Sequence, residues 1–211
     1  MHVNGKVGMG KTKIAIVVLT IAIAVAILSA WLIIGRGFSA RQEPTAVEAF
    51  VARRVRSLAT PRAAKEAQNP VAASQEVLTD AMAHFADHCA FCHANDGSGD
   101  TPIGKGLYPK PPDLRKSETQ ELTDGELFYM IHNGIRLTGM PAFGEEGKED
   151  LDSWKLVHFI RHLPNITPEE IETMKSMNPK TPDELKEEET IRRFLEGDDS
   201  QPPSIPGHKH D

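Results

Sequence analysis

The sequence contains little cysteine, and this scarcity limits the sites that the chain can form. Cys89 and Cys92 are the only cysteines among 211 residues. A zinc site would need a second pair of soft ligands, so the two cysteines do not indicate structural zinc. A thioredoxin-like redox pair would need a βαβ context, whereas the surrounding sequence is typical of helices and loops.

An acid–base or nucleophile constellation is also lacking, so the sequence does not indicate an enzyme that acts by itself. Charge is unevenly distributed: residues 1–75 carry 10 basic and 3 acidic side chains, residues 76–164 carry 8 and 15, and residues 165–211 carry 6 and 12. Nucleic-acid binding needs a basic surface, and the acidic remainder of the chain argues against it. The basic first section suits anionic lipid headgroups.

One long hydrophobic run is present at residues 14–34, and it contains no charge. A helix of this length spans a hydrocarbon core of roughly 30 Å. A cleaved signal peptide would have a shorter apolar region and a small-x-small site, whereas Ala30 and Ala40 follow a large apolar residue at the −3 position. We therefore expect an uncleaved transmembrane anchor at residues 14–34, after a cytoplasmic N-terminus at residues 1–13.

The charges around this run orient it only weakly. Lysines before the run place the N-terminus in the cytoplasm by the positive-inside rule, but arginines after it reduce that asymmetry. The lysines are Lys6, Lys11 and Lys13, and the arginines are Arg36, Arg41, Arg53 and Arg54.

Residues 35–75 are expected to form a juxtamembrane amphipathic helix and a linker. Pro44 suits the first helical position, and five apolar residues then share one helical face. These residues are Val47, Phe50, Val51, Val55 and Leu58. An interfacial helix on anionic lipid, a solvated extension of the anchor and packing on the following domain all fit this pattern. Pro61 and Asn69-Pro70 then indicate a linker at residues 59–75.

The segment Cys89-Ala90-Phe91-Cys92-His93 has the spacing of a c-type haem attachment signature. Cys89 and Cys92 would add to the two porphyrin vinyl groups as thioethers. His93 could then reach the iron as the proximal ligand. The sequence therefore predicts one covalently attached haem c, and it leaves no cysteine for a disulfide.

The elements around this motif are helices joined by loops. Residues 75–90 form the first expected helix, and the glycine- and proline-rich loop at residues 96–112 is incompatible with helix or central strand. Thr123 and Glu126 form a capping box that starts a second helix towards Gly134. A third helix is expected from Asp150 to Leu163, because Pro164 follows.

With these elements, residues 76–164 resemble a small class I cytochrome c, a haem domain whose Met-Pro loop precedes an aromatic-bearing last helix. The stretches at residues 101–113 and 124–134 are similar to membrane-anchored bacterial members. The resemblance implies an all-α class I cytochrome c fold, here with an N-terminal transmembrane helix and a C-terminal helical extension. It also implies that haem is attached outside the cytoplasmic membrane, so the haem domain faces the periplasm.

The resemblance further implies that Met140, 47 residues past His93 and followed by Pro141, is the sixth iron ligand. It places Phe85 and Trp154 near the crossing of the first and last helices. The rival ligands have other expected places: Met130 in the core, Met174 and Met177 beyond the last domain helix, and His132 and His158 at the surface or an edge of helices. A proline carbonyl orients the proximal histidine in this family, and Pro111 and Pro112 both compete for that role.

Residues 165–197 are expected to be a helical extension. Thr167-Pro168-Glu169-Glu170 and Thr181-Pro182-Asp183-Glu184 are near repeats that predict helix starts at about 168 and 182. These helices either pack on the haem domain or form a docking surface for a partner. Residues 198–211 are expected to be disordered, with His208 and His210 either solvated or binding metal weakly.

These inferences favour an electron carrier in which His93 and Met140 hold the iron. Its donor would be a quinol-oxidising complex or a periplasmic dehydrogenase, and its acceptor a terminal oxidase or reductase. The alternative is a haem-bearing subunit of a larger membrane oxidoreductase, with residues 165–197 as the assembly surface. A catalytic or sensing haem protein would need an open iron site, which Met140 argues against.

Overall fold

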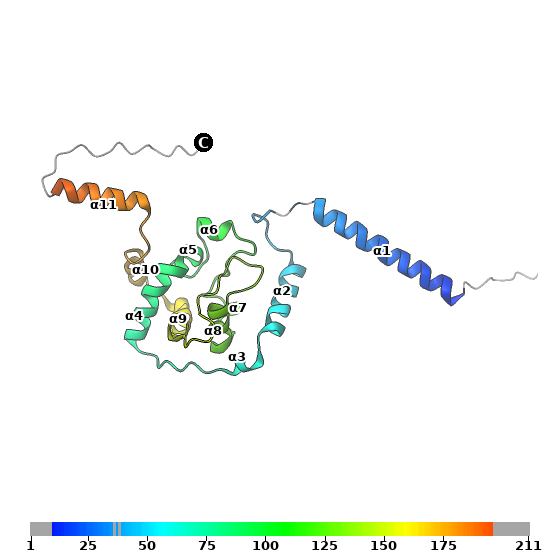
Figure 1. The fold of residues 1–211 in the computed structure, drawn as a ribbon, viewed down its shortest axis with the longest axis horizontal. Helices are drawn as coiled ribbons and strands as arrows, with labels where there is room; N and C mark the ends of the chain where they lie inside the picture. Colours follow the sequence, from blue (N-terminus) through cyan, green and yellow to red (C-terminus); the bar gives the residue numbers. More distant parts are fainter. Residues whose placement is uncertain (1–9, 36, 38, 196–211) are drawn as a thin grey trace, which may run out of the picture. The chain divides into compact units, whose positions relative to one another are not determined.

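The computed structural model describes residues 10–35, 37 and 39–195, and every regular element in that part of the chain is helical (Figure 1). The chain divides into two compact units, one ending at Gln42 and one starting at Glu43. The tail histidines His208 and His210 lie outside the described residues, as do Lys6 and Arg36.

Two of the helical elements, η1 and η2, are not α-helical. In chain order they are α1 (Lys11–Gly35), α2 (Ala46–Ala59), α3 (Arg62–Glu66), α4 (Gln75–His84), the π-helical turn η1 (Phe85–Cys89), α5 (Ala90–His93), α6 (Pro102–Lys105), α7 (Ser117–Gln120), α8 (Asp124–Asn133), α9 (Leu151–His162), the 3-10 turn η2 (Leu163–Asn165), α10 (Pro168–Lys175) and α11 (Pro182–Leu195).

The first unit is built on α1, which contains the apolar run. The helix has 25 residues and a mean hydropathy of 2.8 in its most apolar window, and none of its side chains is buried. Among the described residues, it is the one helix long and apolar enough to cross a membrane. An apolar surface on all sides is typical of a helix that lipid surrounds.

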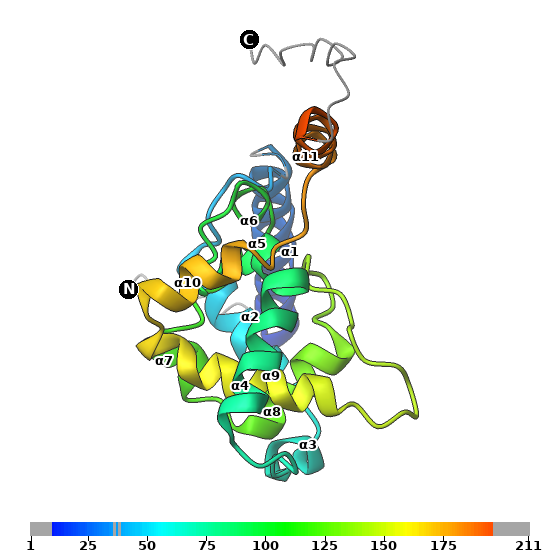
Figure 2. The ribbon, with the colours of Figure 1, turned by 90° about the vertical axis from the view of Figure 1, so that its left-hand side faces the viewer.

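The second unit has its core where α4 crosses α9 (Figure 2). Phe85, directly after α4, packs on Phe159 of α9 with 4.9 Å between ring centroids. Trp154 of α9 stacks on Phe128 of α8 at 4.1 Å and 10°. Phe85 therefore lies where α4 and α9 cross, as predicted, whereas the Trp154 ring packs on α8.

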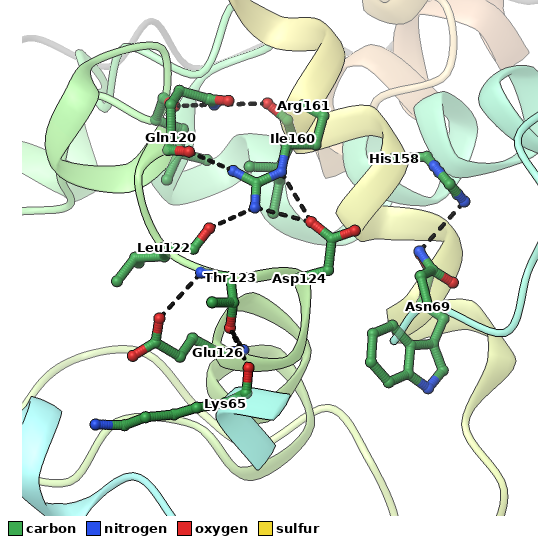
Figure 3. A network of polar contacts seen from close by, with 12 residues as sticks. Lys65, Asn69, Gln120, Leu122, Thr123, Asp124, Glu126, His158, Ile160 and Arg161 are labelled. Atoms are coloured by element: carbon green, nitrogen blue, oxygen red, sulfur yellow. Dashed lines mark hydrogen bonds and ion pairs between the residues drawn. The ribbon is translucent and has the colours of Figure 1, made fainter. Parts of the chain in front are cut away.

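Arg161 ties the end of α9 to the chain around α7 and α8 (Figure 3). Its guanidinium donates to the Gln120 carbonyl at 2.7 Å and to Asp124 Oδ1 at 2.8 and 3.0 Å. Gln120 Nε2 in turn donates to the carbonyl of Ile160 at 2.9 Å. These bonds satisfy the carbonyl of Gln120 at the end of α7 and the carbonyl of Ile160 near the end of α9. Carbonyls in the last turn of a helix lack partners within it.

Helix starts follow the capping signals of the sequence. Thr123 and Glu126 form the predicted capping box of α8, and Thr167 and Glu170 form that of α10. The amphipathic helix α2 differs from the prediction at its start, because Thr45 is the N-cap and Pro44 lies before the helix. Thr45 also forms a capping box, and this bonding outweighs the preference of proline for the first helical position.

One local prediction was incomplete, and two were wrong. The first domain helix changes to π-helical geometry over η1, and the glycine-rich loop contains the short helix α6, which Thr101 caps. Residues 59–75 are not a free linker, because they contain α3 and pack on the domain. Asn69 Nδ2 donates to the Trp154 carbonyl at 2.9 Å, and a Cβ on Gly125 would lie 1.8 Å from the Ala64 carbonyl oxygen. Tertiary contacts therefore order a segment whose local sequence indicates only breaks.

Candidate functional site

The two cysteines and His93 are carried on a backbone that departs from α-helical geometry. Cys89 ends η1, and Cys92 and His93 lie in α5. The Ala90 amide donates to the Phe85 carbonyl, a bond that spans five residues rather than four. Such single π-helical turns within α-helices are frequent at functional sites. The local sequence contained no signal for this turn.

The thiols of the motif have raised pKa values, whereas the thiols of a redox-active pair have lowered ones. Burial raises the pKa of Cys89 to about 12, and the neighbouring Cys92 contributes in the same direction. Burial also raises the pKa of Cys92. Catalytic dithiols need a lowered pKa, because the thiolate is the reactive species. Among the described residues, no three His, Cys, Asp or Glu side chains are placed to hold a metal ion, so the structure provides no zinc site there.

His93 has the properties of a neutral imidazole ligand. Burial lowers its pKa to about 4, and a smaller effect of the Pro112 backbone carbonyl raises it. The Nδ1 atom is buried and makes no hydrogen bond of good geometry in this arrangement. A neutral ring is the form that coordinates iron, and a carbonyl beside the other ring nitrogen would fix its orientation. Between the two prolines that compete for this role, the structure favours Pro112.

The chain after His93 folds back closely against the motif. Ala94 has a φ of 59°, and the Gly99 amide donates to the His93 carbonyl at 2.8 Å. A Cβ on Gly104 would lie 2.7 Å from the Cys92 carbonyl oxygen, so a side chain there would push α6 away from α5. Glycine at this position therefore permits the close approach of two backbones.

Both backbone polar groups of Met140 form hydrogen bonds within its loop. Its amide donates to Thr138 Oγ1 at 3.1 Å, and its carbonyl accepts from the Ile135 amide at 3.1 Å. Thr138 Oγ1 also donates to the Ile135 carbonyl at 2.7 Å. The Met140 side chain is half-buried and packs on the hydrophobic core. The sequence analysis did not identify Thr138, although a hydroxyl two residues before the methionine is a recognisable turn signal.

The loop after His93 and the loop that carries Met140 meet each other. A Cβ on Gly139 would lie 2.8 Å from the Leu107 side chain. Segments that flank the motif and this meeting point also present exposed apolar side chains, which a large apolar cofactor would cover. These are Phe91, Ile103, Tyr108, Leu137 and Phe143, with exposed fractions between 39% and 91%. Thiols, a neutral imidazole, a thioether and apolar surroundings fit a covalently attached haem.

The rival histidines are engaged elsewhere. His132 Nδ1 lies 2.7 Å from Asp150 Oδ2, and His158 Nε2 lies 2.8 Å from the Val71 carbonyl and 3.2 Å from Asn69 Nδ2. Both rings are partly buried rather than on the surface, because each joins its helix to another part of the chain.

Of the rival methionines, Met130 differs from its expected place, whereas Met174 and Met177 lie beyond the last domain helix as expected. Met130 is half-buried but is not a member of the core cluster. Met174 is completely buried in that cluster, although it lies beyond the last helix of the predicted domain, and Met177 packs beside it. The structure thus gives Met174 a packing role that its position in the sequence did not indicate.

Comparison with known families gives one match. Residues 76–160 match the family model described as cytochrome c oxidase, cbb3-type, subunit III. The match is shorter than half of the chain, and it includes both cysteines, His93 and Met140. No curated protein matches the chain.

Proposed function

Residues 76–160 form a c-type cytochrome domain, and from this premise we propose that the protein is a membrane-anchored mono-haem cytochrome. It transfers single electrons between respiratory partners on the periplasmic side. The observation that carries the proposal is that the matched domain contains both thiols with raised pKa values, the buried His93 ring and the hydrogen-bonded Met140 loop.

Each residue of the site has a stated role in this proposal. Cys89 and Cys92 attach haem c as thioethers, and His93 and Met140 are the iron ligands. When bound, the iron supplies reversible one-electron oxidation and reduction. The Pro112 carbonyl orients His93, and Thr138 holds the Met140 backbone in place. A ligand pair held this firmly needs little rearrangement when the charge of the site changes.

The anchor gives the electron carrier its location. We propose that α1 crosses the cytoplasmic membrane once, with the N-terminus in the cytoplasm and the haem domain in the periplasm. The length and uniform apolarity of α1 support the crossing. Confinement to a layer beside the membrane raises the effective concentration of the haem near membrane-bound donors and acceptors. A quinol-oxidising complex, a dehydrogenase or a terminal oxidase or reductase would be such a partner.

A haem-bearing subunit of a larger membrane oxidoreductase is the second candidate. The matched family takes its description from an oxidase subunit, and α11 exposes the apolar side chains Leu185, Ile191 and Leu195. A stable complex would co-purify with the chain at high salt. A carrier with an acidic haem domain would instead bind its partner transiently and lose that binding as salt rises.

Absorption spectroscopy of the purified full chain tests the haem site. The oxidised protein should show the far-red band of methionine-ligated ferric haem, and carbon monoxide should not change the reduced spectrum. Met140→Ala should abolish the band and allow carbon monoxide to bind, because the sixth position loses its ligand.

Met130→Ala is the matched control and should retain the band, because Met130 belongs to α8 and is not proposed as an iron ligand. A wild-type protein that binds carbon monoxide and lacks the band would contradict the closed site and favour a sensing or catalytic haem.

A further inference from the structure

The helix α2 (Figure 1) exposes the side chains of its apolar face. The five exposed apolar side chains are Val47 (71%), Phe50 (54%), Val51 (49%), Val55 (59%) and Leu58 (85%). The less exposed positions lie on the opposite face, at Ala49 and Arg56, and the C-cap Thr60 is buried. An amphipathic helix on a soluble domain normally buries its apolar stripe, so this orientation is reversed.

Polar contacts hold α2 in this orientation. Arg53 lies 3.9 Å from Glu118 of α7, and Lys65 Nζ donates to the Ser57 carbonyl at 2.6 Å. Thr123, the N-cap of α8, donates its hydroxyl to the Lys65 carbonyl at 2.9 Å. The residues after α2 thus join its C-terminal end to the start of α8, and a rotation of α2 that buried its apolar face would break these contacts.

The charges on α2 complement an anionic surface. Glu48 is its one acidic residue and takes part in the capping box, whereas Arg53, Arg54 and Arg56 are basic. Arg54 lies on the apolar side, with its guanidinium 5.4 Å from the centre of the Phe50 ring. No carboxylate within the described residues pairs with Arg54. In an interfacial helix, an arginine beside apolar side chains can extend its guanidinium to the lipid headgroups.

We propose that α2 lies in the interface of the membrane that α1 crosses, with its apolar face among the lipid chains and Arg54 at anionic headgroups. The proposal rests on the anchoring by α1 proposed above. Ten residues separate Gly35 from Ala46, and ten extended residues reach at most about 35 Å, so α2 stays within reach of the bilayer surface. Because α2 is joined to α8, its attachment also selects the side of the haem domain that faces the membrane.

Site-directed spin labelling of the full haem-loaded chain in phosphatidylglycerol-containing vesicles tests this placement. Both native cysteines are consumed by haem, so a single introduced cysteine can be labelled. Val51→Cys places the label on the apolar face, and Ala52→Cys, one residue further and exposed on another face, is the matched control. Two accessibilities of the label are measured and compared. One is to oxygen, which concentrates in lipid, and the other is to a water-soluble nickel complex.

At Val51→Cys we expect the label to be more accessible to oxygen than to the nickel complex. At Ala52→Cys we expect it to be more accessible to the nickel complex. Vesicles of zwitterionic lipid alone should lower the oxygen preference at Val51→Cys, and Arg54→Gln should lower it in anionic vesicles. The haem absorption spectrum checks that each variant is folded. An unchanged preference in zwitterionic lipid would overturn the role of anionic headgroups.

Other outcomes separate this proposal from the anchoring. A label at Val51→Cys that is accessible to the nickel complex in a vesicle-inserted chain would overturn only the placement of α2. Low accessibility to both reagents would mean that a protein surface, such as a second copy, covers this face, and it would also overturn the lipid assignment. A chain that stayed in the aqueous phase would overturn the anchoring and the placement together.

Discussion

The helices α10 and α11 begin with nearly the same residues but differ in what they bury. Thr167 caps α10 and Thr181 accepts from the Glu184 amide at the start of α11, each followed by proline. Met174 of α10 is completely buried, whereas Leu185 and Ile191 of α11 are 53% and 51% exposed. The comparison shows that a capping signal determines where a helix starts and says nothing about whether the helix packs.

The surroundings of the two helices explain the difference. The helix α10 follows α9 after a single 3-10 turn. Glu170 Oε1 lies 2.9 Å from Nε2 of His162 at the end of α9. The ion pairs of α11 are local, such as Arg193 with Glu189 at 3.0 Å. The contact between Glu170 and His162 holds α10 beside α9 and directs Met174 towards the core, whereas the pairs Lys180–Glu188 and Arg193–Glu189 at α11 join residues close in sequence. This comparison yields three predictions about stability.

Met174→Ala should have the largest effect, because it leaves a cavity in the core. Large-to-small substitutions of this kind cost about 2–5 kcal/mol of unfolding free energy. Leu185→Ala, on the exposed face of α11, should change it by less than about 0.5 kcal/mol. Denaturant unfolding of the haem-loaded chain in detergent, followed by circular dichroism, measures both. Equal effects would mean that the two helices pack equally.

Thr167→Ala should have the next largest effect, because it removes the N-cap of a packed helix. Loss of such a cap costs typically about 1 kcal/mol. Thr181→Ala removes the same cap from α11, and it should leave the global unfolding free energy unchanged while lowering the helical signal before the transition. If Thr181→Ala destabilised the haem domain as much as Thr167→Ala, α11 would be part of the cooperative unit.

Glu170→Gln should give the smallest effect, and that effect should depend on pH. Burial raises the pKa of Glu170, but hydrogen bonds from the Thr167 amide and His162 outweigh it and hold the pKa below its ordinary value of 4.5. The ionised carboxylate therefore stabilises the fold above about pH 4.5, and this contribution is lost as the pH falls through the folded-state pKa. Wild type should exceed Glu170→Gln in stability near neutral pH, and the two should converge in acid.

Glu184→Gln is the control for this titration. The Thr181 backbone and side chain lower the pKa of Glu184 as well, but the carboxyl group is fully exposed on α11. Its substitution should leave the pH dependence of global unfolding unchanged. A Glu170→Gln variant whose deficit persisted at low pH would show that the loss is one of packing rather than of charge.

The same distinction separates what could be predicted elsewhere in the chain from what could not. The capping box at Thr123 and the haem attachment spacing depend on residues within a few positions of each other, so the sequence contains them in full. The sequence left open whether the C-terminal helices pack on the haem domain, and it did not indicate the ordering of residues 59–75. Both depend on partners far along the chain, such as the Trp154 carbonyl that Asn69 contacts. The π-helical turn that ends at Cys89 departs from the regular helix that the periodic pattern predicts.

The sequence by itself determined the apolar helix, the starts of the capped helices, the attachment motif and the Met-Pro loop, because each arises from neighbouring residues or from a periodic pattern. Only the tertiary structure decided that Pro112 rather than Pro111 faces His93 and that α2 exposes its apolar face. These outcomes depend on which surfaces compete for the same space when distant segments pack. A periodic pattern identifies the apolar face of a helix, and only the folded neighbours determine what that face meets.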